Sequence, residues 1–301
     1  MRKNYLLALS SIVFIVIVVG SYVIVAQSPM TGTWTADARE NKDGKIHVSF
    51  ERRSEKGGHN QMGQSYDYSE LQGLNPSQTQ NGSVSFSLVR EAGRIDCVGT
   101  FTDGKGAGTF TFTPNRSFVD AMRSRGFDFD KQTARGTNDV EERLFAATTL
   151  NVTTRLADDL LSANFGKLDV DDLFKAAIFK VDSQFMSEMK ASGFPNLTME
   201  DLVKARIFKI DAAWVRDVNS MGFAGNDFEQ LVKFRIFKVT PEFLQSLKNE
   251  GFDKLDAEQV VKFRIFNIDT DFIRQAKAED PNVTVEDLVQ MKIGVRRRSH
   301  E

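Results

Sequence analysis

Few side chains in this chain are of the types that catalyse reactions or bind metals. The 301 residues include one cysteine, Cys97, and three histidines, His47, His59 and His300, which are spread over the whole length. Zinc and iron sites usually need clustered Cys, His and carboxylate ligands, so we expect no metal centre. The chain also has no Gly-x-Ser-x-Gly motif, no phosphate-binding glycine-rich loop and no Gly-x-Gly-x-x-Gly before a helix. The sequence therefore predicts a protein that is not an enzyme and uses no cofactor.

Two of these residues have structural explanations. His47 lies between Ile46 and Val48 in an alternating pattern, which places its side chain on the solvent face of a strand. Cys97 has the same parity as Ile95, which predicts a small buried side chain rather than a nucleophile. The charge balance is also unremarkable, with 39 Lys and Arg against 41 Asp and Glu. A net charge of −2 excludes a general nucleic-acid-binding surface.

The N-terminal region, residues 1–27, has the pattern of a signal-anchor. Residues 6–26 carry no charge and follow Arg2 and Lys3. A helix of 21 apolar residues crosses the hydrocarbon core of a bilayer, and the preceding positive charges keep its start in the cytoplasm. We therefore expect a membrane-anchored protein whose folded part lies outside the cytoplasm. The alternative is a secretory signal cleaved after Ala26, which would make the protein secreted or periplasmic.

Residues 30–116 have the alternating pattern of β-strands. Apolar side chains occupy every second position around Trp34 and over 46–50, 84–88, 95–101 and 110–112, with Gly-containing turns between them. The sequence predicts about five strands in an antiparallel β meander or barrel-like domain. The Gly-rich stretch 57–64 is expected to be a loop, and 65–71 a loop or short helix. Tyr66 and Tyr68 are expected either to cover one end of this domain or, with Trp34, to line a ligand mouth.

The second half of the chain repeats itself every 29 residues. The segment Ile-Phe-Lys-Val at 178–181 returns in closely similar form at 207–210, 236–239 and 265–268. Helix N-cap residues recur with the same period, and they are Thr153, Asp182, Asp211, Thr240 and Asp269 for a first helix and Asp169, Thr198, Asp227, Asp256 and Thr284 for a second. Each first helix is expected to end at a Gly-Phe pair such as Gly222-Phe223.

Two short helices cannot bury their apolar faces alone, so the repeats must stack. We predict an α+β multidomain protein in which residues 153–295 form an α-solenoid-like array of helix pairs. Residues 117–152 are expected to be a degenerate first repeat, and residues 296–301 a basic tail. The repeated phenylalanines, among them Phe237, are expected to form the core of the array.

Basic residues also recur within the repeats. Lys204, Lys233 and Lys262 each follow a glutamate by four residues, which explains them as pairs within one helix. The remaining cations are the candidate partner-binding ridge: Arg206, Arg235, Arg264, Lys209 and Lys238. The structural alternative is that each arginine bonds the last carbonyls of its own helix or the acidic cap of the next helix.

Two unlike segments in this order resemble a known family. Residues 104–114, Gly-Lys-Gly-Ala-Gly-Thr-Phe-Thr-Phe-Thr-Pro, precede repeats such as Arg-Ile-Phe-Lys-Val-Thr-Pro-Glu-Phe at 235–243. This arrangement is similar to the extracytoplasmic C-terminal region of some bacterial membrane metallopeptidases of the M56 (BlaR1-type) family. The family repeat has His and Gly where this chain has Phe237 and Lys238. Its His-Glu-x-x-His zinc site has no counterpart here, so the resemblance implies an accessory or sensing module without peptidase activity.

These observations favour a non-catalytic, membrane-anchored interaction or sensor module. Its expected partners are the membrane, through residues 6–26, and a protein, with a membrane signalling protein as the candidate that the resemblance implies. The alternative is a protein that binds a small apolar ligand in the β domain, near Trp34 and Tyr66. A co-purifying protein would favour the first reading, and a co-purifying lipid or small molecule the second.

Overall fold

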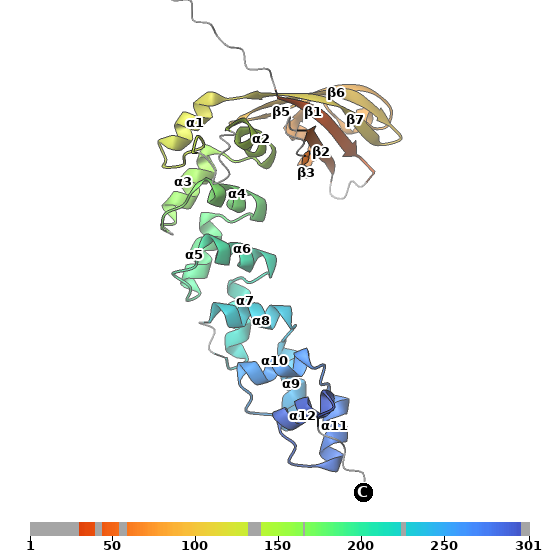
Figure 1. The fold of residues 1–301 in the computed structure, drawn as a ribbon, viewed down its shortest axis with the longest axis vertical. Coiled ribbons are helices and arrows are strands. Elements are labelled where there is room, and N and C mark those ends of the chain that lie inside the picture. The colour runs from red at the N-terminus through yellow and green to blue at the C-terminus, as the bar shows by residue number, and fades with distance from the viewer. Residues whose placement is uncertain are drawn as a thin grey trace, which may run out of the picture.

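The computed structural model describes residues 30–39, 44–53, 59–131, 140–164, 166–223 and 227–295. The expected membrane segment 6–26 and the basic tail 296–301 lie outside these residues. Within the described ranges, no helix has both the length and the apolar character needed to cross a membrane. The described part combines a curled sheet with twelve α-helices, so the expected α+β class is confirmed (Figure 1).

The N-terminal part is one antiparallel sheet that curls into a half-barrel (Figure 1). Its strands are β1 (Met30–Asp37), β2 (Lys45–Arg53), β3 (His59–Asp67), β4 (Leu71–Gln72), β5 (Gly82–Arg90), β6 (Gly93–Thr102) and β7 (Lys105–Pro114). Their order in the sheet is β3-β2-β1-β7-β6-β5-β4, so the first strand pairs with the last. Short 3₁₀-helices, η1 (Tyr68–Glu70) and η2 (Pro76–Thr79), connect β3 to β4 and β4 to β5.

The five expected strands are present, but the loop predicted over 57–64 was wrong for its described part. Residues from His59 onward belong to β3, which pairs with all of β2. The sequence of β3 is polar and contains a glycine, so it lacks the hydrophobic alternation that predicts a strand. Its strand conformation depends on packing against β2. At Gly63 the two strands pack so closely that a Cβ atom would lie 2.4 Å from Ser49 Oγ. Tyr66, also expected in a loop or short helix, is the next-to-last residue of this strand and is fully buried.

The helical part begins with a pair that joins the array to the sheet. This pair is α1 (Arg116–Arg123) and α2 (Val140–Leu150), which are the expected degenerate repeat. Helix α2 lies against the curled sheet (Figure 1), where the ring of Phe145 stacks on Phe110 with centroids 5.3 Å apart and meets Phe50 edge-on at 6.1 Å. The β domain and the first repeat therefore share one hydrophobic core.

Five further helix pairs extend the array away from the sheet (Figure 1). The first helices of the pairs are α3 (Thr154–Ser162), α5 (Ser183–Ala191), α7 (Ala212–Ser220), α9 (Pro241–Asn249) and α11 (Thr270–Glu279). The second helices are α4 (Val170–Phe179), α6 (Met199–Ile207), α8 (Phe228–Ile236), α10 (Ala257–Ile265) and α12 (Val285–Lys292).

The expected helix ends are confirmed. Every predicted N-cap side chain accepts a hydrogen bond from a backbone N–H in the first turn of its helix, as Asp211 does from Trp214 at 2.8 Å. Gly193, Gly222 and Gly251 have positive φ angles of 103°, 90° and 82° after the first helices. Helices α2, α4, α6, α8 and α10 are followed by left-handed residues that are not glycine, namely Asn151, Lys180, Lys209, Lys238 and Asn267, whereas α12 is followed by Gly294, whose φ is 75°.

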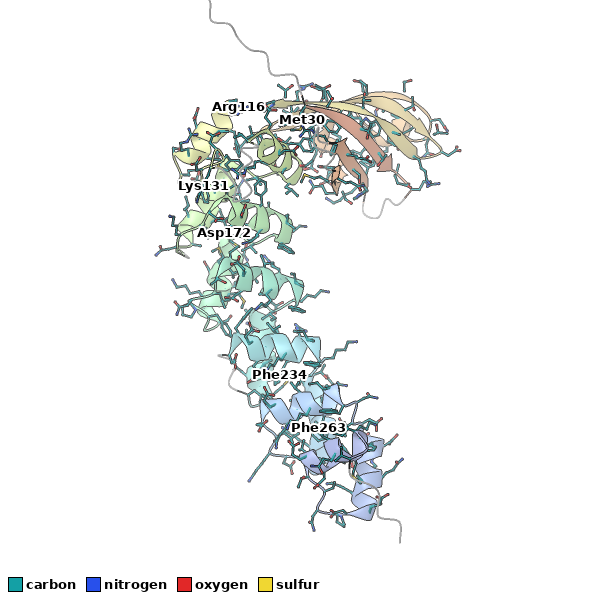
Figure 2. All side chains as sticks on the ribbon, viewed as in Figure 1. Met30, Arg116, Lys131, Asp172, Phe234 and Phe263 are labelled. Atoms are coloured by element: carbon teal, nitrogen blue, oxygen red, sulfur yellow. The ribbon has the colours of Figure 1, made fainter. Side chains whose placement is uncertain are left out.

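The expected core of the array needs one correction. Phe237 is only partly buried, because it follows the last helical residue of α8 and lies at the edge of the helix pair. The fully buried rings are three residues earlier, at Phe234 and Phe263, which lie within the array (Figure 2). Their rings meet Phe223 and Phe252 edge-on, with centroids 5.1 and 5.3 Å apart.

Candidate binding surface

The second helices expose one isoleucine each, and we call these residues the isoleucine row. The row consists of Ile178, Ile207, Ile236, Ile265 and Ile293, whose exposed fractions are 51, 54, 48, 51 and 54%. Four of them are at or next to the end of α4, α6, α8 and α10, and Ile293 is the C-cap of α12. Scattered exposed apolar side chains are ordinary, whereas a regular series of them marks an interaction surface. The sequence analysis missed this row, because the period alone does not tell an exposed position from a buried one.

Ion pairs between successive repeats run beside the isoleucine row. Lys204 bonds Glu229 and Lys233 bonds Glu258, each at 2.7 Å, and Lys175 and Lys262 pair in the same way with Glu200 and Glu286. The predicted pairing of these lysines with the glutamate four residues earlier was therefore wrong, although Lys204 also lies 3.9 Å from Asp201 of its own helix. Stacking brings the glutamate of the next second helix within reach, and this contact raises the pKa of Lys204 and Lys233.

The ion pairs show how the second helices face solvent. Glu200, Lys204 and Ile207 are spaced i, i+4 and i+7 along α6, so they lie on one helix face. The lysine of this face touches the same face of the next second helix. The isoleucines consequently recur along the side of the array that carries these ion pairs.

The arginines of the expected ridge are held against aromatic rings. The guanidinium carbons of Arg206, Arg235 and Arg264 lie 3.8, 3.8 and 3.6 Å from ring centroids. The rings belong to the first helix of the same repeat, and they are Phe185, Trp214 and Phe243. In the last repeat, Lys292 takes the same place over Phe272 at 4.3 Å. Each cation therefore joins the two helices of its repeat.

Hydrogen bonds also tie these arginines to the scaffold. Arg235 Nη2 donates to the carbonyl of Lys209 at 2.9 Å, which is the end of the preceding second helix. Arg206 Nη2 lies 3.8 Å from Asp182, the acidic N-cap of α5. Partial burial lowers the pKa of Arg264. The arginines thus bond the scaffold, as the structural alternative expected, but their partners are preceding helices rather than their own helix end or the cap of the next helix. These contacts leave less of each guanidinium for a partner.

The two lysines of the ridge are different. Lys209 and Lys238, together with Lys180, are exposed and have φ angles of 54°, 52° and 55°. Among the described residues, none of their ammonium groups has a carboxylate within 4.0 Å. Each follows a row isoleucine by two residues. Free positive charges thus accompany the isoleucine row.

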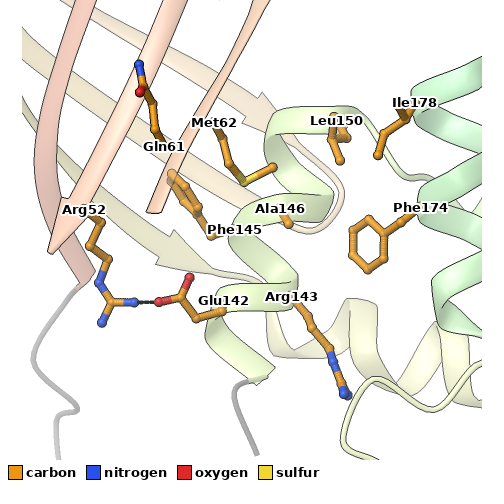
Figure 3. Close-up of a pocket in the computed structure, with 10 residues that line it drawn as sticks. All are labelled: Arg52, Gln61, Met62, Glu142, Arg143, Phe145, Ala146, Leu150, Phe174 and Ile178. Atoms are coloured by element: carbon orange, nitrogen blue, oxygen red, sulfur yellow. Dashed lines mark hydrogen bonds and ion pairs between the residues drawn. The ribbon is translucent and has the colours of Figure 1, made fainter. Parts of the chain in front are cut away.

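A pocket of about 530 Å³ opens where the array meets the sheet (Figure 3). Its apolar wall combines β3, α2 and α4 through Met62, Phe145, Ala146, Leu150, Phe174 and Ile178. An ion pair between Arg52 and Glu142 lies at its side. Ile178 also starts the isoleucine row, so this corner pocket and the row form one continuous surface.

The ligand mouth expected near Trp34 and Tyr66 does not form around these rings. Trp34 is 1% exposed, and its Nε1 donates to the carbonyl of Val98 at 3.1 Å. Tyr66 is fully buried, its hydroxyl donates to the carbonyl of Thr149 at 3.2 Å, and burial raises the pKa of that hydroxyl. Tyr68 is partly buried against the same core. Burying two large aromatic rings stabilises the half-barrel, which is why the fold uses them as core.

The remaining candidates follow their sequence interpretation. Cys97 is completely buried, and burial raises the pKa of its thiol. His47 is on the exposed face of β2. Within the described ranges, no group of three or more His, Cys, Asp or Glu side chains is arranged to hold a metal ion. No protein-family model matches the chain, and no curated protein is significantly similar to it.

Proposed function

We propose that this protein is a non-catalytic interaction module that binds a protein partner along the isoleucine row. The observation that carries the proposal is the repeated exposure of a large apolar side chain at the end of each second helix. Fully burying an isoleucine is worth about 1.5–3 kcal/mol, so half-exposed side chains offer about 1 kcal/mol each to a partner that covers them. Exposed side chains that served neither folding nor binding would not be expected to be apolar at the same position of all five helix pairs from α3–α4 to α11–α12.

The location that we propose is outside the cytoplasm, with residues 6–26 as a membrane anchor. The apolar segment after Arg2 and Lys3 supports this. The resemblance to the M56 (BlaR1-type) extracytoplasmic region supports a partner that is itself a membrane signalling protein. On this proposal the half-barrel and α2 form the base, and the array extends from it to present the isoleucine row.

Site-specific photocrosslinking in native cells tests the interaction. A photoreactive phenylalanine analogue at Ile236 is expected to give a discrete crosslinked product. Matched positions are Leu161 on α3, which is 41% exposed, and Val98 on β6, which is 54% exposed. Equal crosslinking from all three positions, or none from Ile236, would contradict the proposal.

A second candidate function is binding of a small apolar ligand, and the corner pocket is the observation that favours it. Its volume of about 530 Å³ is within the range of small-molecule sites, and most of its lining is apolar. Native mass spectrometry of the purified chain would show such a ligand as an added mass. Ala146→Trp would fill the pocket and abolish the added mass. Leu161→Trp, on the first helix α3 and outside the pocket lining, would keep it.

A further inference from the structure

Three lysines beside the isoleucine row adopt a backbone conformation that disfavours them. Lys180, Lys209 and Lys238 all have φ between 52° and 55°, in the left-handed region that glycine and asparagine adopt more easily than lysine. The chain does use asparagine at the equivalent positions before and after them, Asn151 and Asn267. Folding alone therefore gives no reason for lysine in the three central repeats.

The structure also shows no internal use for these ammonium groups. The other lysines on this side, such as Lys204 and Lys233, are paired with glutamates of the next repeat. Lys180, Lys209 and Lys238 are exposed and, within the described ranges, have no such pair. Residues in a strained conformation that nothing in the fold requires are typical of functional sites.

The charges on this side are separated along the helix axis. The first turns of the second helices are acidic, with Glu200 and Asp201 in α6 as an example, and the last turns are basic. The isoleucines and free lysines lie at the basic ends. Asp182 and Asp211, which cap the first helices that follow, also lie near these ends and keep their negative charges. The ends of α6 and α8 nevertheless each bring an arginine together with a free lysine, Arg206 with Lys209 and Arg235 with Lys238, so positive charges outnumber the cap carboxylates there.

The spacing of the row fits an α-helical partner segment. Ion pairs join successive second helices, and packed helices lie about 8–10 Å apart, so we expect the row to repeat on about that scale. Seven residues of an α-helix rise about 10.5 Å. A helix with apolar side chains every seventh residue would meet one row isoleucine per heptad.

We propose that the partner segment is an acidic amphipathic helix with heptad-spaced apolar residues, whose carboxylates pair with Lys180, Lys209 and Lys238 while its apolar face covers the isoleucine row. This inference rests on the proposed function and specifies the chemistry of the partner. Protein is favoured over an anionic membrane as occupant because the row isoleucines recur from repeat to repeat, and the array that carries them is elongated (Figure 1), which suits a linear segment.

Fluorescence anisotropy with the purified full chain tests this proposal. The probes are two labelled peptides of four heptads with identical leucines, one with glutamate and the other with lysine at the flanking positions. We expect the glutamate peptide to bind, and K180N/K209N/K238N to weaken it by about ten-fold at low salt. Asparagine keeps the left-handed backbone and removes the charge. The matched control K190Q/K248Q/K254Q removes three exposed lysines elsewhere and should leave affinity unchanged.

Four results would overturn the proposal: equal binding of both peptides, unchanged affinity of the asparagine variant, no binding of the glutamate peptide, or preferential sedimentation with phosphatidylcholine–phosphatidylglycerol vesicles. The crosslinking experiment distinguishes failure of the acidic-helix inference from failure of the proposed function. A product from Ile236 with no binding of the acidic peptide would keep the interaction surface and reject only an acidic helical partner.

Discussion

The guanidinium of Arg235 lies over the indole of Trp214, with 3.8 Å between the guanidinium carbon and the ring centroid. The two residues belong to α8 and α7, the two helices of one repeat. The same contact recurs between Arg206 and Phe185 and between Arg264 and Phe243. The three arginines that the sequence suggested as part of a partner-binding ridge thus join the two helices of their own repeats.

Replacing the three stacked arginines should therefore lower stability. R206Q/R235Q/R264Q removes three cation–π contacts, each worth about 0.5–2 kcal/mol, and the bond to the Lys209 carbonyl. We expect a lower melting temperature in thermal unfolding followed by circular dichroism. Arg216→Gln, on the exposed side of α7, is the control and should leave the melting temperature unchanged. If the triple variant kept its melting temperature and lost the crosslinked product, the arginines would instead be part of the partner-binding site.

The two phenylalanines of α8 and its C-cap should differ in their contribution to the core. Phe234→Ala removes a fully buried ring and should reduce the free energy of unfolding by about 3–5 kcal/mol. Phe237→Ala removes a partly buried ring and should cost about 1–2 kcal/mol. Urea denaturation of both variants measures the difference. Equal losses would show that the ring of Phe237 is as deeply packed as that of Phe234.

A lysine-to-asparagine change in the left-handed position should not harm folding. Asparagine adopts this conformation more readily, so Lys238→Asn should keep or raise the free energy of unfolding by up to about 1 kcal/mol. The reverse change, Asn267→Lys, should lower it by a similar amount. Denaturant titration checks both variants. A loss of stability in Lys238→Asn would mean that the lysine has a structural role.

The thiol of Cys97 should be inert while the protein is folded. It is completely buried, and burial raises its pKa, so the reactive thiolate is disfavoured at neutral pH. An aromatic disulfide reagent is expected to react with the thiol only after denaturant is added. Cys97→Ala carrying Val98→Cys moves the thiol to an exposed position of the same strand and should react at once. Fast reaction of the native Cys97 would show that β6 opens readily.

Membrane attachment is a separate prediction from residues 6–26. The full chain should stay in the membrane fraction after alkaline carbonate extraction, because an apolar helix of this length does not leave the bilayer. A chain lacking residues 1–27 should be recovered in the soluble fraction. A mature N-terminus at Gln27 by mass spectrometry would support the cleaved secretory signal instead.

Local signals predicted much of the array. The cap residues and the glycines after the first helices are all where the 29-residue period indicates. Short-range hydrogen bonds between a side chain and its own helix decide these features, so neighbouring residues suffice to predict them. The alternating strands, with His47 exposed and Cys97 buried, follow from the two-residue period of side chains along a strand, which is also a local property.

Only the tertiary structure decided which residues of this pattern face a partner. Ile236, Phe237 and Lys238 recur together, yet the isoleucine is half-exposed, the ring is partly buried and the lysine is free. Stacking of the second helices paired Lys204 with Glu229 of the next helix rather than with Glu200, four residues earlier in its own helix. The packing of α2 into the half-barrel likewise created the corner pocket. Each of these outcomes depends on contacts between segments far apart in the chain, and no local pattern records which of several equivalent faces those contacts will cover.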